Sequence, residues 1–180
     1  MKSSIMKQIE SFARKYCEEE VIKSGYEDQN LWKNHVQLVR KYAIKLAKKE
    51  KADLFVVEAA ALLHDIGKYK GRKGHDELSY KLSKDFLNKL DIPKKDLILK
   101  CISKHGSEYS SEENEIEVKV LQSADALGTL FDDEWQEHSR KTMDKDILLG
   151  FFEKTYKKIN LESAKKMAEK QIRKLKGKLI

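Results

Sequence analysis

The chain has 180 residues, which favours a single domain, and 40% of them are hydrophobic, enough for one core of ordinary size. Charged residues make up 37%, and although the net charge is +7, basic and acidic residues are interspersed, as on a solvated, ion-paired surface. Only five of the 37 basic residues are arginines, which gives little support to specific nucleic-acid recognition, and no apolar run approaches the ~20 residues of a membrane span.

Sparse helix breakers and a helical apolar period predict an all-α chain. There is one proline and there are eight glycines. Apolar residues recur at three- and four-residue steps in successive segments. The predicted helices cover about residues 2–23, 30–50, 53–66, 76–90, 93–105 and 116–130, with further helical pattern at 147–156 and 161–175.

The signals at the predicted helix ends agree with these ranges. Asp53 is a credible N-cap, and Pro93 suits the first position of a helix that reaches His105. Residues 67–74 and 107–115 are expected to be loops. No strand-like alternation, repeat or linker interrupts the chain, so we expect one all-α domain over residues 1–180. It would end in a Lys-rich helical C-terminal extension over 135–180.

Four polar groups occupy positions where burial is expected. His64 and Asp65 close the apolar run Ala59–Leu63, while His35 and Asp125 lie on the apolar faces of their own helices. Buried polar groups need a hydrogen-bond partner, a counter-charge or a cation. Neutral imidazole together with carboxylate suits Mn, Fe, Co, Ni or Zn better than Ca. Four such ligands on an octahedral ion would leave two positions for water and substrate.

Each of these groups also has a structural interpretation. His35 could be a core histidine bonded to a carbonyl group, and His64-Asp65 could interact with the helix end. Asp125 could form an ion pair with a lysine or arginine. Lys68 and His75 could be ordinary surface residues, and His138 is expected on the surface.

The order His35, His64-Asp65, Asp125 resembles the H…HD…D signature of the HD-domain metal-dependent phosphohydrolases. The segments AALLHDIGK, GHDELSYKLSKDFL, ISKHGS and VLQSADALG resemble successive segments of that family, in the same order. The resemblance covers about residues 30–130 and implies an HD-domain helical bundle. The Gly-Tyr-Pro element of members that hydrolyse cyclic dinucleotides is absent, which argues against that activity.

The resemblance also implies roles for single residues. His35, His64, Asp65 and Asp125 would be ligands of a divalent metal (Mn, Fe, Co, Ni, Mg or Zn), and Asp65 could bridge to a second ion. His75 and His105 match positions that ligate the second metal or line the phosphate site. Lys68, directly after the motif, would neutralise phosphate charge. Asp76 and Glu77 are candidates for the general acid or base.

The expected protein is therefore a metal-dependent phosphohydrolase that cleaves a phosphate ester, foremost of a nucleotide, by attack of metal-bound hydroxide. Alternatives are a phosphodiesterase or nucleoside triphosphate hydrolase with the same centre, or a non-catalytic, metal-stabilised module that binds nucleotides or nucleic acid. Cys17 and Cys101 form no paired motif, and residues 1–20 contain no apolar signal core. We therefore expect a cytoplasmic protein with no membrane contact.

Overall fold

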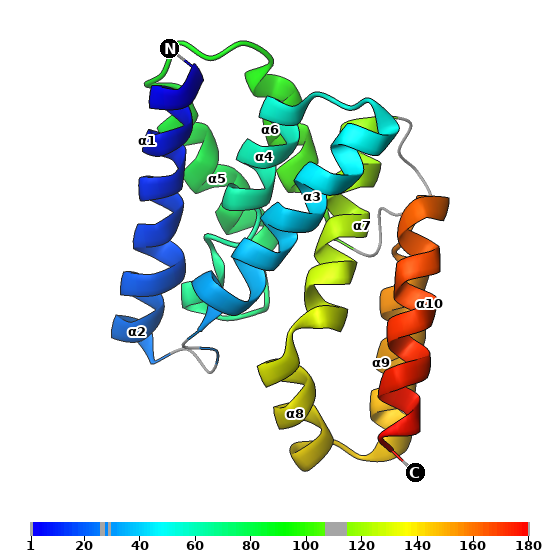
Figure 1. Cartoon of the computed structure of the whole chain (residues 1–180). Coiled ribbons are helices and arrows are strands. Elements are labelled where there is room, and N and C mark those ends of the chain that lie inside the picture. The colour runs from blue at the N-terminus through cyan, green and yellow to red at the C-terminus, as the bar shows by residue number, and fades with distance from the viewer. Residues whose placement is uncertain (1, 26–27, 29, 107–114, 180) are drawn as a thin grey trace.

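The computed structural model describes residues 2–25, 28, 30–106 and 115–179, and every regular element in these ranges is helical (Figure 1). The all-α fold expected from the sequence is confirmed. Elements η1 and η2 are single π-helical turns, and η3 is a short 3-10 turn. In chain order the elements are α1 (Lys2–Arg14), η1 (Lys15–Glu20), α2 (Val21–Ser24), η2 (Leu31–Val36), α3 (Gln37–Glu50), α4 (Leu54–Leu63), η3 (Lys68–Lys70), α5 (His75–Leu87), α6 (Lys95–Ser103), α7 (Ile116–Phe131), α8 (Asp133–Thr142), α9 (Lys145–Lys157) and α10 (Glu162–Gly177).

Helix α4 is the centre of the bundle. Nearly all of its side chains are apolar, and residues from every side of the helix are buried, as expected for a helix surrounded by others. It packs against α1, α3, α6 and α7. Asp53 caps its N-terminus as predicted, because its carboxylate accepts hydrogen bonds from the N–H groups of Phe55 (2.9 Å) and Val56 (3.2 Å).

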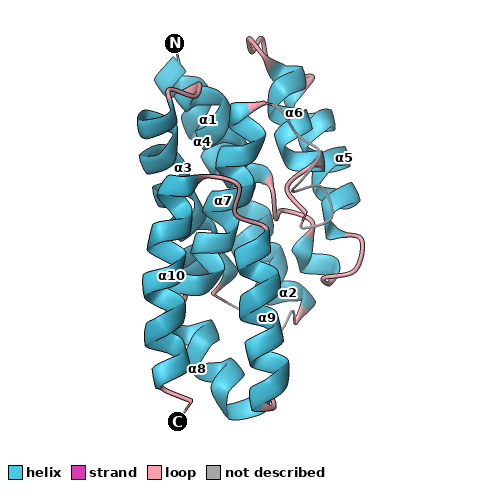
Figure 2. Cartoon of the chain, turned by 90° about the vertical axis from the view of Figure 1, so that its right-hand side faces the viewer, coloured by secondary structure: helices cyan, strands magenta, loops and turns pink. Residues whose placement is uncertain are grey.

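The C-terminal helices cover the outer side of α7, where α9 and α10 lie side by side (Figure 2). Small residues of α10, Ala164 and Ala168, are fully buried and allow close approach to the bundle. Gln171 fixes the register, since its Nε2 donates to the carbonyl of Leu130 at 3.0 Å. No helix within the described ranges combines the length and apolar character that a bilayer crossing requires.

Several predicted helix limits are corrected: the helices predicted to reach residues 66 and 90 end at Leu63 and Leu87. Helix α6 begins at Lys95 rather than Pro93, because the chain turns at Lys94 in a left-handed conformation (φ 59°). The same helix ends at Ser103, so His105 lies beyond it. Most of helix α8 falls within the predicted helical extension over 135–180, but no separate helical pattern located it, since most of its residues are charged or polar. The predicted loop at 107–115 lies outside the described residues, except for Glu115.

Gly67 allows the start of α5 to lie directly against the end of α4. A Cβ atom at this position would lie 2.5 Å from the carbonyl oxygen of His75 and 2.9 Å from the backbone nitrogen of Ser79. The Gly67 N–H donates to the Oγ of Ser79 at 2.9 Å. Because Gly67 has no side chain, residues 64–65 and 75–76 can lie next to one another.

We predict that Gly67→Ala lowers the free energy of unfolding by about 1–3 kcal/mol, because the backbone of α5 must move to accept the methyl group. Urea denaturation followed by circular dichroism measures the change. Gly150→Ala is the matched control, since nothing lies within 4 Å of its Cβ position in α9. It should raise stability by about 0.5–1 kcal/mol. Equal stability of the two variants would contradict the close-approach argument.

Candidate metal centre

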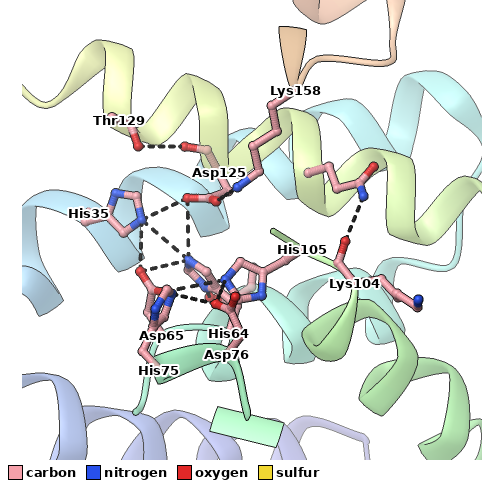
Figure 3. Close-up of polar contacts among 12 residues, drawn as sticks. His35, His64, Asp65, His75, Asp76, Lys104, His105, Asp125, Thr129 and Lys158 are labelled. Atoms are coloured by element: carbon pink, nitrogen blue, oxygen red, sulfur yellow. Dashed lines mark hydrogen bonds and ion pairs between the residues drawn. The ribbon is translucent and has the colours of Figure 1, made fainter. Parts of the chain in front are cut away.

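Four imidazole groups converge on two buried aspartates in the interior of the bundle (Figure 3). Each comes from a different segment, so the site depends on the fold. The contributing positions are His35 in η2, His64 and Asp65 directly after α4, His75 and Asp76 at the start of α5, His105 after α6, and Asp125 in α7. The structure therefore brings together every histidine and aspartate that the sequence predicted as a ligand.

The potential ligand atoms form two groups. His35, His64 and Asp125 form one, and Asp65, His75 and His105 form the other, with the ligand atoms of each group within 4.8 Å of one another. In the first group, the Nε2 of His35 lies 3.0 Å from the Oδ1 of Asp125. Either group could hold a divalent metal ion.

Asp65 belongs to both groups through its two oxygens. Its Oδ2 lies 3.1 Å from the Nε2 of His35 and 3.2 Å from that of His64. Its Oδ1 faces the other group, 3.3 Å from the Nε2 of His75 and 3.8 Å from that of His105. The carboxylate is thus placed to bridge two ions.

Three of the histidines are oriented in the same way. The Nδ1 atoms of His64, His75 and His105 lie 2.6–2.8 Å from the backbone carbonyl three residues earlier. Only a protonated Nδ1 can donate to a carbonyl, so each neutral ring directs the lone pair of its Nε2 into the site. This arrangement is typical of histidines that bind metals.

Two carboxylate oxygens face the Nε2 atoms of these histidines. The buried Oδ1 atoms of Asp65 and Asp76 accept no hydrogen bond from any described residue. Their nearest neighbours are imidazole nitrogens, at 3.3 Å for Asp65 and 2.8 Å for Asp76. Two lone pairs facing one another repel unless a proton or a cation lies between them. The donor set therefore fits a divalent cation of the kind that binds both imidazole and carboxylate.

The ionisation of the site follows from its carboxylates. Burial alone would lower the pKa of His64, but Asp65 and Asp125 outweigh it and raise this pKa to about 9. Burial also opposes the charge of His75, yet Asp65 and Asp76 raise its pKa to about 10. His105 differs, because burial and the nearby cations His64 and Lys158 lower its pKa to about 4.

Both central carboxylates stay ionised despite their burial. Burial tends to raise the pKa of Asp65, but His64 and Lys68 hold it well below its usual range. For Asp125, Lys158 and His35 outweigh burial in the same direction. The site therefore presents fixed negative charge, which a cation would stabilise.

Two lysines contact the two central carboxylates. Lys68 places its Nζ 2.5 Å from the Oδ2 of Asp65. Lys158 forms an ion pair with the Oδ2 of Asp125 (Figure 3). The structural interpretation of Asp125 as the partner of a lysine is thus also observed, together with its contact to His35. Lys158 was not predicted as a site residue, because nothing in the sequence distinguishes it from the other lysines of the C-terminal region.

The buried side chain of Gln122 joins the segments that carry His105 and Lys158. Its Nε2 donates to the carbonyl of Lys104 at 2.7 Å, and its Oε1 accepts from the Nδ2 of Asn160 at 2.7 Å. One α7 side chain therefore positions two site segments. Of the other candidates, Asp76 faces His75 and His105, whereas Glu77 and His138 are exposed.

A cavity of about 340 Å³ opens above these residues, a size typical of small-molecule sites. The polar groups just described form part of its lining. The remaining wall comes from η2 and the chain before it, the C-terminal part of α7, and α8 and α9. The lining residues outside the His/Asp cluster include Asp28, Leu31, Thr129, Asp132, Trp135, Phe151, Lys154 and Thr155.

Comparison with known proteins identifies the family. The model of the HD domain matches residues 32–130, more than half of the chain. The chain belongs to the HD-domain family. The resemblance deduced from the four sequence segments is confirmed, and its metal-binding character agrees with the ligand groups described above. No curated protein matches the chain significantly.

Solved structures extend the similarity over almost the whole chain. An HD-superfamily hydrolase from Bacillus thuringiensis is 22% identical, with a TM-score of 0.68, over 99% of this chain and 95% of that one. A predicted HD-superfamily hydrolase from an uncultured Thermotogales bacterium is also 22% identical (TM-score 0.61, 94% and 86% covered). Bacillus subtilis YpgQ, solved in complex with ADP, is 25% identical (TM-score 0.59, 97% and 97% covered).

We predict that a divalent metal displaces protons from this site. His64 and His75, with pKa values of about 9 and 10, carry protons at pH 7, whereas metal ligation requires neutral imidazole. Metal affinity should therefore rise with pH and level off above about pH 10. Calorimetry at pH 7 in two buffers with different ionisation enthalpies measures the protons released. Binding without proton release would contradict the prediction.

Proposed function

We propose that this HD-domain protein is a metal-dependent phosphohydrolase that acts on nucleotides. The observation that carries the proposal is the cluster of imidazoles and carboxylates in the wall of a cavity, with one lysine paired to each central aspartate. Family membership and the hydrolases among similar folds support the reaction class. The ADP bound to YpgQ supports a nucleotide as the substrate.

In this proposal His35, His64, Asp65 and Asp125 bind one divalent ion. His75, His105 and Asp65 bind a second, and the orientation of Asp65 between the two groups supports two ions rather than one. Such ions supply Lewis-acid chemistry, which polarises phosphoryl oxygens and makes water a stronger nucleophile at neutral pH. The Nδ1–carbonyl contacts of three histidines would keep the ligand nitrogens directed at the ions.

The two lysines would act on the substrate. Lys68 and Lys158 border the cavity beside Asp65 and Asp125, so a phosphate group near the ions lies within reach of both ammonium groups. Positive charge fixed there stabilises the negative charge of a phosphoryl group during transfer. Asp76, which faces the cavity beside His75 and His105, is placed to hold or move a proton.

The ligand assignment predicts that Asp125→Asn, which preserves side-chain volume, loses bound metal and lowers kcat/KM at least about 100-fold, since even outer-shell partners are worth 10–100-fold. The assay is phosphate release from nucleoside mono-, di- and triphosphates, with Mn, Mg, Co or Ni added. Asp96→Asn, at an exposed position of α6, is the matched control. Wild-type turnover by metal-free Asp125→Asn would exclude the proposed role.

The two-ion arrangement predicts the metal content of a second variant. Elemental analysis of the wild-type protein should give about two ions per chain, and His105→Ala should retain about one, because the His35–His64–Asp125 group is untouched. A wild-type content of one ion, unchanged by His105→Ala, would instead place His75 and His105 in substrate contact.

A further inference from the structure

One face of α9 builds part of the cavity wall outside the ligand cluster. Phe151, Lys154, Thr155 and Lys158 all line the cavity, and their spacing of three and four residues places them on the same helical face. Lys158, at the C-terminal end of this face, contacts Asp125. Phe151 is seven residues away, roughly 10 Å along the helix axis. The face therefore runs from a cationic end at the ligand cluster to an aromatic end.

A second aromatic ring extends the far end of this wall. Trp135 of α8 lies against Phe151, with ring centroids 4.5 Å apart and an angle of 37° between the planes. Both rings are only partly buried, and both line the cavity. Neither is in the group of residues that could hold metal. The pair thus offers aromatic surface to whatever occupies the cavity.

The distribution of charge along the wall indicates which end each part of a ligand would occupy. Lys154 lies between the aromatic pair and Lys158, one helical turn from Phe151 and one from Lys158. An anionic chain could follow these two lysines toward the ligand cluster. A planar ring at the other end would meet Trp135 and Phe151. An extended nucleotide has both parts and can span the distance between them.

We propose that α8 and α9 form the nucleoside-binding wall of the site: the base stacks on the Trp135–Phe151 pair, and the phosphates extend past Lys154 to Lys158. This inference rests on the proposed nucleotide substrate. All four residues follow residue 130, outside the part of the chain that matches the HD-domain model. The Lys-rich C-terminal region is thereby assigned the selection of the substrate base.

Two ligands that differ only in the nucleoside test this assignment. Adenosine 5′-(α,β-methylene)diphosphate carries a base and resists cleavage between its phosphorus atoms, whereas methylenediphosphonate lacks the nucleoside. Trp32 does not line the cavity, so Trp32→Phe leaves Trp135 as the single tryptophan, whose fluorescence is excited selectively over that of the tyrosines. With metal-loaded protein, the adenosine compound should quench Trp135 fluorescence on binding, and methylenediphosphonate should bind without quenching it.

Substitutions in the cavity wall distinguish a loss of base stacking from a general effect on the fold. Phe151→Leu keeps an apolar side chain. It should lower the affinity for the adenosine compound about 5- to 150-fold, the range for loss of one base–aromatic stack, and leave the affinity for methylenediphosphonate unchanged. Trp135→Phe should retain most of the affinity. Lys154→Ala should lower the affinity for both compounds. Lys157→Ala, on the neighbouring exposed face of α9, is the matched control and should leave both affinities unchanged.

The outcomes distinguish this inference from the function on which it rests. Equal affinities of the two compounds, with unquenched Trp135, would overturn the nucleoside wall even if the enzyme cleaves phosphate esters. An effect of Phe151→Leu on both compounds would also overturn it, because the change would then act through the fold. Failure of both compounds to bind, with no turnover of any phosphate ester, would overturn the proposed function as well.

Discussion

The buried carboxylate of Asp65 is the constraint around which the rest of the structure is arranged. Its side chain is 1% exposed, yet it remains ionised. An isolated charge in such a place would cost several kcal/mol, so the fold must surround it with compensating groups. The imidazoles of His35, His64 and His75 and the ammonium of Lys68 do so, and they come from η2, the end of α4, α5 and η3. Compensation of one charge therefore fixes how these segments meet.

The positions of the compensating groups explain the unusual local structure near the site. Neighbouring residues in a helix point about 100° apart, so His64 and Asp65 can face the same centre only where α4 has ended. The absence of a side chain at Gly67 allows α5 to pack close to this end. Gln122 donates a hydrogen bond to the carbonyl of Lys104 and so positions the segment after α6. His35 lies in a π-helical turn, a feature that is frequent at functional sites because it redirects a side chain within a helix. Each irregularity thus serves to direct a side chain at Asp65.

The sequence predicted the parts of this arrangement that have a local signal. Apolar periodicity located α3, α4 and α7, and Asp53 marked the start of α4. His35 and Asp125 were predicted as site residues because they are polar residues on apolar helix faces. The structure brings them together with His64 and Asp65. Lys158 has no such signal, because its pairing with Asp125 depends on how α9 docks on α7. Helix α8 was not located as a separate helix because its polar sequence lacks a broad apolar face.

The cavity also has lining residues in α8 and α9 that no sequence pattern marked as part of a site. Asp65 and its imidazoles constrain one another, so a change in any of them exposes the others to an uncompensated charge. Trp135, Phe151 and Lys154 are free of that constraint, since none forms a hydrogen bond or ion pair with Asp65 or Asp125, and yet they line the same cavity. Substitution on this wall can therefore alter what the cavity admits while leaving the ligand cluster intact. A family that shares its central motif can change substrates in this way, by altering the helices that follow it.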